Sequence, residues 1–457
     1  MKKFIETLKN IWKIKELRNR ILFTLALLAV YRFGSFVLLP GVVPDALANS
    51  LKTPGGGQNI FDLISLFTGG AFSKGAIFAL GIMPYITASI IIQLLGFAVP
   101  YFQRLQQKEG ESGRKKITQI TRGLTVLITL VQGGGYLKLI SGTPGALSPE
   151  MPVGLFWIAG IIILSSGTIF AMWLGERITD KGIGNGISLL IMIGIIASLP
   201  QMLALEFVTQ FNGGGGILFV IEMALFFVVV LATILIVQGV RKIPIQFAKR
   251  MVGRGASAMP AAGARDYIPL KVNAAGVMPI IFAQAIMFLP ATIATFFVKD
   301  QTQLAEGILA QLQNPFSFIS SVIAFLLVVV FTYIYTALLV NPQQYAEYLK
   351  RQNAFIPGIK PGKNTADFID TVTTRVTLPG SIFLGLITIL PAVAVAFGVN
   401  QGFAIFFGGT SLLILVAVVL DTLQQIESHL LMRRYDGLVK SGRLKGRSGM
   451  QGIGAGM

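Results

Sequence analysis

The sequence predicts an all-α, polytopic membrane protein with ten spanning helices. Of its 457 residues, 53% are apolar and 13% are charged, about half the charged fraction of an ordinary soluble domain. The mean hydropathy is +0.72. Several apolar runs are long enough to cross about 30 Å of hydrocarbon as a helix. These values exclude a soluble globular enzyme, a disordered chain and a secreted disulfide scaffold.

The spans follow from the apolar runs, taken in chain order. Several of them contain Gly, Pro, Ser or Gln in mid-span, which is typical of helices that face protein or a cavity rather than lipid. The predicted spans are residues 21–39, 75–97, 117–137, 153–174, 183–202, 217–239, 274–297, 316–340, 378–397 and 403–423.

Basic residues set the predicted orientation. All but five of the 38 Lys and Arg lie in the N-terminus (1–20), the tail (424–457) and every second connecting segment. Such a split is a strong positive-inside signal, so both termini are predicted to be cytoplasmic. Two cytoplasmic loops, residues 240–273 and 341–377, are longer than ordinary connections. The formal net charge of +18 is therefore concentrated on one side of the membrane.

A short apolar segment precedes the second span. Residues 60–67 are predicted to form about two helical turns, too few to cross a bilayer, and Gly69 and Gly70 follow as a hinge candidate. An apolar helix of this length is not stable in external water. The sequence alone leaves two alternatives open: the segment lies in the membrane interface, or it folds into a cavity within the helix bundle.

Ordered motifs give a family resemblance. Residues 79–95, ALGIMPYITASIIIQLL, resemble the second transmembrane segment of the SecY family, the central subunits of protein-conducting channels. The resemblance covers nearly the whole chain. Its further motifs are GIGNGIS at 182–188, RKIPIQFAKR at 241–250, VNAAGVMP at 272–279, FIPGIKPG at 355–362 and GGTSLLI at 408–414.

This resemblance implies the architecture and the function. The chain is expected to form two pseudo-symmetric five-helix halves, an N-terminal half (21–202) and a C-terminal half (217–423), around an hourglass pore. It is expected to sit in the bacterial plasma membrane, to pass unfolded secretory polypeptides across, and to release membrane-protein segments laterally into lipid. Implied partners are the small subunits SecE and SecG, the motor ATPase SecA, the ribosome, signal peptides and membrane lipid.

The resemblance also assigns the short helix. Residues 60–72 are expected to be a plug that fills the external funnel of the resting channel and moves aside for a polypeptide. Glycine accepts backbone conformations that other residues resist, so a glycine pair can absorb the change. The expected plug residues are Ile60, Phe61, Leu63, Ile64, Phe67, Gly69 and Gly70.

A pore that holds back ions needs a narrow apolar gasket, because aliphatic side chains offer water and ions no hydrogen bonds. The family has a ring of such residues at the waist. Two pairs among the matching positions are spaced i,i+4 and so share a helix face. The expected ring is Ile82, Ile86, Ile191, Ile195, Ile281 and Ile414.

A lateral exit is implied between the second and third spans and the seventh and eighth. Polar side chains in apolar helices are normally satisfied across a helix interface, so a few such bonds would form a weak latch. The alternative is static helix–helix packing. The candidate gate residues are Thr87, Ser89, Gln93, Thr129, Gln132 and Gln284.

The two long cytoplasmic loops are the expected docking surface. Basic loops attract polyanions and acidic protein faces, and in the family they bind the ribosome and SecA. The alternative is that these basic residues only set the membrane topology and bind anionic lipid headgroups. The family usually has Arg at the position of Lys360. The positive charge is kept, but an ammonium group replaces the planar guanidinium, which can make two parallel hydrogen bonds. The candidates are Arg241, Lys242, Lys249, Arg250, Arg254, Lys350, Arg351, Lys360 and Lys363.

Other function classes fit the sequence less well. A secondary transporter of a small solute would need charged residues near mid-membrane, where the chain is nearly bare. The depths of Arg32 and Glu222 permit an ion pair, and snorkelling of Glu222 to the outer surface is the alternative. The chain has no cysteine and one histidine, His429, and it lacks a His-Glu-x-x-His motif and a phosphate-binding loop. We therefore expect no catalytic, metal or cofactor site.

Overall fold

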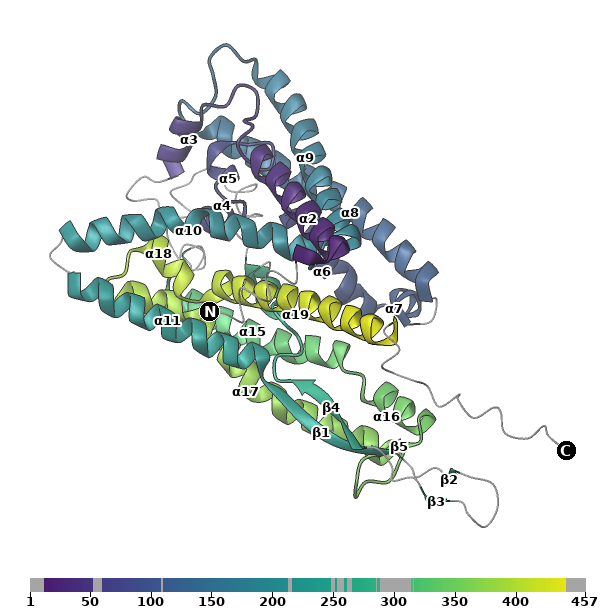
Figure 1. The fold of residues 1–457 in the computed structure, drawn as a ribbon. Coiled ribbons are helices and arrows are strands. Elements are labelled where there is room, and N and C mark those ends of the chain that lie inside the picture. Colours follow the sequence, from purple (N-terminus) through teal and green to yellow (C-terminus); the bar gives the residue numbers. More distant parts are fainter. Residues whose placement is uncertain are drawn as a thin grey trace.

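The fold is a bundle of long helices with a small sheet at one end (Figure 1). The computed structural model describes residues 12–51, 60–107, 110–212, 216–247, 251–252, 259–260, 265–284, 286–287, 314 and 316–440. Within these residues, seven helices are long and apolar enough to cross a membrane. The chain is therefore a multi-pass membrane protein, as predicted.

The helices of the N-terminal part lie together. α2 (Lys15–Gly34), α8 (Gly110–Gly142) and α9 (Val153–Lys181) pack with the shorter α6 (Met83–Ala98) in one region of the molecule (Figure 1). Three short helices complete this region: α3 (Pro44–Leu51), α5 (Ala71–Lys74) and α7 (Pro100–Gln107).

A second group of helices forms the C-terminal part. α15 (Phe318–Leu339) packs along α17 (Lys363–Ala396), and α11 (Gly216–Gln238) contacts α19 (Gly409–Lys440). α10 (Gly186–Asn212) runs between the groups and contacts α2 and α9 on one side and α11 and α19 on the other (Figure 1). α10 is therefore the structural link between the two halves.

The second and the last span begin as helix well after their predicted first residues, because glycines interrupt the apolar runs. The second span begins as helix only at Met83, since the preceding residues form turns in which Gly75 and Gly81 have φ of 68° and 53°. The last span begins at Gly409, with φ of 62°. Before it lie the short α18 (Gln401–Ala404) and a 3₁₀ turn, η1 (Ile405–Phe407). Left-handed backbone ends a helix, a constraint that hydrophobicity does not reveal.

The seventh predicted span is only partly described. Residues 278–284 and 286–287 are helical. The remainder of the predicted span, from 288 to 297, lies outside the described residues.

The two long loops add short strands to the mostly helical fold. β1 (Val240–Phe247) pairs antiparallel with β4 (Arg265–Lys271) and with β5 (Ala354–Phe355), giving the strand order β4-β1-β5. A two-stranded ladder joins β2 (Met251–Val252) to β3 (Met259–Pro260).

The sheet joins the two loops through its own apolar core. Ile243 and Ile245 alternate with exposed neighbours along β1 and pack with Leu349 of α16 (Pro342–Arg351) and Ile369 of α17. This period of two is typical of a half-buried strand. The two loops, which residues 274–340 separate in the chain, therefore form one unit, which we call the cytoplasmic unit after the side of the membrane predicted for it.

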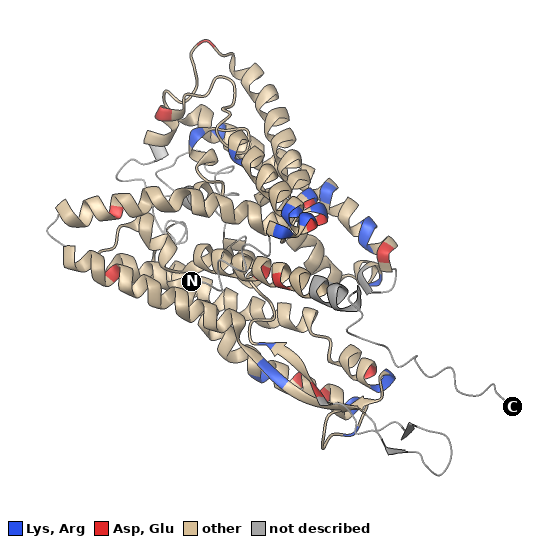
Figure 2. Cartoon of the chain, in the orientation of Figure 1, with Lys and Arg blue, Asp and Glu red and all other residues tan. Residues whose placement is uncertain are grey.

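Charged residues gather at one end of the bundle. Blue and red segments cluster near the start of α2, around α7 and the adjoining ends of α8 and α9, and over β1 and α16 (Figure 2). The opposite end is mostly uncharged in the same view. This asymmetry is typical of a membrane protein whose charged end faces the cytoplasm.

Candidate functional site

All six isoleucines expected at the pore waist belong to one large apolar cluster. Five are buried, and the half-buried Ile281 packs against the same group of side chains, which we call the central cluster. The six are Ile82 and Ile86 at the start of α6, Ile191 and Ile195 on α10, Ile281 in the helical turn at 278–284, and Ile414 on α19. The cluster also contains side chains of several other helices, so the ring itself stays a prediction.

The short helix α4 (Ile60–Phe67) packs against the helix bundle through its C-terminal turn. Leu66 and Phe67 are 5% and 7% exposed and belong to the central cluster, against which Ile64 also packs. α4 contacts α10. These contacts of the described side chains favour the cavity alternative. The side chains of Ile60, Phe61 and Leu63 lie outside the described residues.

Gly194 makes room for α4 on α10. It lies on the same stretch of helix as Ile191 and Ile195, and a Cβ built there would clash with the carbonyl group of Phe67. Sequence reasoning missed this residue, although a glycine between pore isoleucines is a recognisable signal of close backbone approach.

The predicted hinge has left-handed backbone at both glycines. Gly69 and Gly70 have φ of 63° and 86°. Gly70 N donates to Ser65 O at 2.7 Å, and the Thr68 hydroxyl accepts a hydrogen bond from Phe72 N at 3.2 Å. Side chains with a Cβ rarely adopt such φ values, so the sequence places its glycines where the turn requires them.

Two side chains from other helices hold the hinge region by its backbone carbonyls. Arg32 of α2 donates from Nη1 to Gly69 O at 2.7 Å. Tyr136 of α8 donates from its hydroxyl to Phe72 O at 2.6 Å, and its ring packs on the Phe72 ring at 4.6 Å between centroids. Tyr136 could not be singled out from the sequence, since a tyrosine in an apolar helix can have many roles.

Across the seam between α6 and α15, one predicted gate residue accepts a hydrogen bond from the opposite helix. Tyr335 of α15 donates its hydroxyl proton to Gln93 Oε1 of α6 at 2.8 Å. Gln93 Nε2 in turn donates to Ser89 Oγ at 3.1 Å. Two candidates, Ser89 and Gln93, thus lie in one network across the seam. Tyr335 was not predicted, because its partner is 242 positions away in the chain.

The remaining gate candidates make other contacts. The hydroxyl groups of Thr87 and Thr129 donate to backbone carbonyls one turn back on their own helices. Gln132 is half-buried on α8. Gln284 donates from Nε2 to Thr410 Oγ1 of α19 at 2.9 Å, within the C-terminal half. These residues do not form one polar cluster with Gln93.

Arg32 and Glu222 have separate partners. Glu222 of α11 is buried rather than snorkelling, and its Oε1 accepts from Gln210 Nε2 at 3.1 Å. The same amide donates to Glu206 Oε1 at 2.9 Å, and Glu206 Oε2 accepts from Asn400 N at 3.2 Å. This network ties the end of α10 to α11 and to the start of α18, where the two halves are joined.

The predicted docking residues are exposed on the cytoplasmic unit wherever they are described. Arg241 and Lys242 lie on β1, and Lys242 Nζ sits 4.7 Å from the centre of the Tyr267 ring. Lys350, Arg351, Lys360 and Lys363 are exposed at the end of α16 and the start of α17. Lys249, Arg250 and Arg254 lie outside the described residues.

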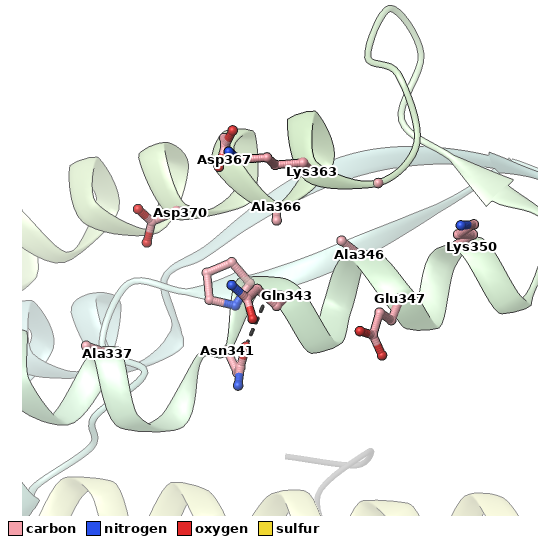
Figure 3. Close-up of a pocket in the computed structure, with 12 residues that line it drawn as sticks. Ala337, Asn341, Gln343, Ala346, Glu347, Lys350, Lys363, Ala366, Asp367 and Asp370 are labelled. Atoms are coloured by element: carbon pink, nitrogen blue, oxygen red, sulfur yellow. Dashed lines mark hydrogen bonds between the residues drawn. The ribbon is translucent and has the colours of Figure 1, made fainter. Parts of the chain in front are cut away.

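The second long loop is less uniformly basic than expected. A cavity of about 680 Å³ between α16 and the start of α17 is lined by Glu347, Asp367 and Asp370 as well as by Lys350 and Lys363 (Figure 3). Both signs of charge are therefore presented together on this part of the cytoplasmic unit.

Comparison with known proteins gives a consistent result. The SecY family model matches residues 76–423. A protein translocase subunit SecY from Chlamydia muridarum is 40% identical over 462 residues, covering 96% of this chain and 99% of the relative. Its counterpart in Streptomyces galbus is 41% identical over 440 residues, covering 94% and 98%.

Solved structures share the fold. A structure of a protein-conducting channel matches with a TM-score of 0.64 at 18% identity, covering 93% of this chain and 94% of that one. A structure that concerns how the plug domain of SecY stabilises the closed state of the channel matches with a TM-score of 0.61 at 19% identity, with the same coverage. The channel of a canine ribosome–channel complex matches with a TM-score of 0.59 at 17% identity, again with 93% and 94% covered.

Proposed function

This chain belongs to the SecY family and is a subunit of a protein translocation channel, and from that premise we propose how its residues perform the transport. The pore runs between the N-terminal half (21–202) and the C-terminal half (217–423). It passes unfolded secretory polypeptides across the bacterial plasma membrane, with both chain termini in the cytoplasm. The relatives do not favour a secondary transporter.

The central cluster carries this proposal. Six isoleucines from both halves, together with Leu66 and Phe67 of α4, pack in one apolar group. Aliphatic side chains exclude ions by dewetting and can deform around any sequence, since they make no specific hydrogen bonds. The isoleucine ring forms the narrow apolar constriction that holds back ions, and α4 is the plug that closes this constriction in the resting state.

The seam between α6 and α15 is the lateral gate. Tyr335 and Gln93 are hydrogen-bonded across it, and apolar side chains of both helices belong to the central cluster. Interhelical hydrogen bonds in membranes are weak, averaging about 0.6 kcal/mol. An apolar segment of a translocating chain can therefore replace these contacts and pass into lipid, whereas a polar segment stays in the pore.

The cytoplasmic unit is the docking surface for the ribosome and for SecA, and the small subunits SecE and SecG complete the complex. Its support is the exposure of Arg241, Lys242, Lys350 and Arg351 on a sheet-and-helix platform that both long loops build. A related fold occurs in the canine ribosome–channel complex.

Removing the plug tests the seal. Deletion of residues 60–70 removes α4 and its hinge but keeps α5. We expect the reconstituted channel to conduct ions in the absence of substrate, measured as single-channel current. A conductance that stays at the closed baseline would contradict the plug role of α4.

Crosslinking tests the path. The chain has no cysteine, so single cysteines at Ile82, Ile86 or Ile281 are unique attachment points. Each is expected to crosslink to a stalled secretory chain. A cysteine at Ile162, which is 60% exposed on α9, is the matched control and is expected not to react. Equal crosslinking yields for cysteines at Ile162 and Ile82 would contradict the assignment of Ile82 to the pore.

A further inference from the structure

We propose that Arg32 is a positioning residue that keeps the plug closed, because its guanidinium fixes the peptide group between Gly69 and Gly70. The inference rests on the proposed function of α4 as the plug. We call the hydrogen bond from Arg32 Nη1 to Gly69 O the latch. Nothing in the family comparison assigns a role to this bond.

The latch is a close and charge-assisted contact. The distance from Nη1 to Gly69 O is 2.7 Å, and a Cβ built on Gly69 would clash with Nη1. The accepting carbonyl lies just beyond the C-terminal end of α4, where helix carbonyls carry partial negative charge and favour a cation. Hydrogen bonds with a charged donor are about twice as strong as neutral ones.

The position of the latch matters more than its strength. The peptide group that joins Gly69 to Gly70 is planar, so the direction of its carbonyl is set by ψ of Gly69 and φ of Gly70. These are the rotations that would swing α4 away from α10. A guanidinium that holds this carbonyl therefore resists both hinge rotations.

The other side of the hinge is held independently. Tyr136 bonds Phe72 O, and Ala71 and Phe72 of α5 are both buried. This anchor lies after the hinge glycines, so it can persist while α4 moves. The plug can thus leave by breaking the latch and the local hydrogen bonds across the hinge, such as that from Ser65 Oγ to Ser73 Oγ at 3.0 Å, without unpacking α5 from Tyr136.

Arginine in an outer membrane half has to be compensated. An ionised side chain within a membrane span is costly and is normally paired or functional. Here the guanidinium bonds a backbone carbonyl and lies 4.9 Å from the centre of the Phe36 ring. A lysine would retain the charge but would lose the planar face that stacks on an aromatic ring.

The test measures exposure of the plug directly. In the channel complex reconstituted in lipid vesicles, a single cysteine at Leu66, which is 5% exposed, is labelled with a polar methanethiosulfonate reagent. The labelling rate follows the fraction of open plug. We expect Arg32→Gln to raise the rate about 10-fold, equivalent to about 1.4 kcal/mol, and Arg32→Lys to raise it about 3-fold.

Two controls separate latch release from general loosening. Lys74→Gln removes the other cation that lies over Phe36, at 4.6 Å, and is expected to leave the rate at Leu66→Cys unchanged. A cysteine at Ala171, which is fully buried on α9, is expected to remain unlabelled in the Arg32 variants. Labelling there that rises by the same factor would mean that Arg32 only stabilises the bundle, and would overturn the proposal.

The latch and the plug can fail separately. If both Arg32 variants label Leu66→Cys at the parental rate while deletion of 60–70 gives an ion leak, the latch is wrong and the plug stands. If the deletion gives no leak, the plug role is wrong whatever the labelling rates are. If Arg32→Gln is not recovered from membranes, Arg32→Lys and its labelling rate still decide the question.

Discussion

Tyr335→Phe is expected to make lateral release easier by a small and calculable amount. The substitution removes the hydroxyl that donates to Gln93 Oε1 at 2.8 Å and keeps the ring, which packs edge-on against Phe282 at 5.3 Å. Hydrogen bonds between membrane helices average about 0.6 kcal/mol and reach about 1.7. The ratio of open to closed gate should therefore rise about 3-fold, and at most about 18-fold.

The assay is the release of test segments of graded hydrophobicity. One Leu, Ile, Phe or Val in a membrane helix is worth about 0.3–0.6 kcal/mol of insertion free energy. The loss of one average interhelical bond thus corresponds to one or two such residues. In Tyr335→Phe, we expect the segment that is half released to lipid to contain one or two fewer leucines than in the parent channel.

Two further variants make the result specific. Tyr333→Phe, on the same helix, is the matched control and should leave the release threshold unchanged. In a double-mutant cycle, Gln93→Leu and Tyr335→Phe should be non-additive by the same 0.6 to 1.7 kcal/mol, approximately. Additive effects of these two substitutions, or an equal shift in Tyr333→Phe, would refute the assignment of this bond to the gate.

Three other substitutions test the plug seat, its anchor and the joint between the halves. Gly194→Ala should push the plug backbone off α10 and raise the ion leak of vesicles toward that of the plug deletion, whereas an unchanged leak would show that the site can accommodate a methyl group. Tyr136→Phe removes one of two donors to the carbonyl of Phe72, which still accepts from Gly75 N at 3.3 Å. It should lower the free energy of unfolding by about 0.5–1.5 kcal/mol with no ion leak; a leaking variant would place this contact in the moving part. Glu206→Ala removes the acceptor of two hydrogen bonds and should lower the free energy of unfolding by about 1–3 kcal/mol, measured in detergent against Glu206→Gln, which is expected to retain part of it.

Hydrophobicity and charge were sufficient to predict the helical membrane fold. Hydropathy predicts that a span is present because a helix needs about 20 apolar residues to cross the bilayer, whatever its neighbours are. Hydropathy predicts the first and last residues of the helix less well. The start of α6 at Met83 depends on left-handed turns at Gly75 and Gly81, and a hydropathy pattern does not contain dihedral angles.

Candidate site residues could be named from the sequence where the family resemblance supplied matching positions, and not where a residue acts through a distant partner. The isoleucines of the central cluster were named as the positions that match the family's apolar ring. Tyr335 and Tyr136 were not, since each bonds a group on another helix, 242 and 64 positions away. The strands β1 and β4 carried a period-two signal, which the basic charge of the loop obscured.

The magnitudes explain how such a channel can be closed and still open for the correct segments. The bond across the seam and the bond at the hinge each contribute about one power of ten or less to the closed state. An entering segment with ten strongly apolar residues gains about 3–6 kcal/mol on reaching lipid, which exceeds either contact. One charged residue at the centre of that segment costs about 2.5–3.5 kcal/mol and cancels most of the gain. Because the polar contacts are weak, the hydrophobicity threshold for lateral release lies where a single charged residue decides whether a segment enters lipid or stays in the pore. A much stronger contact at Gln93 or Gly69 would keep the gate or the plug closed when a substrate segment enters.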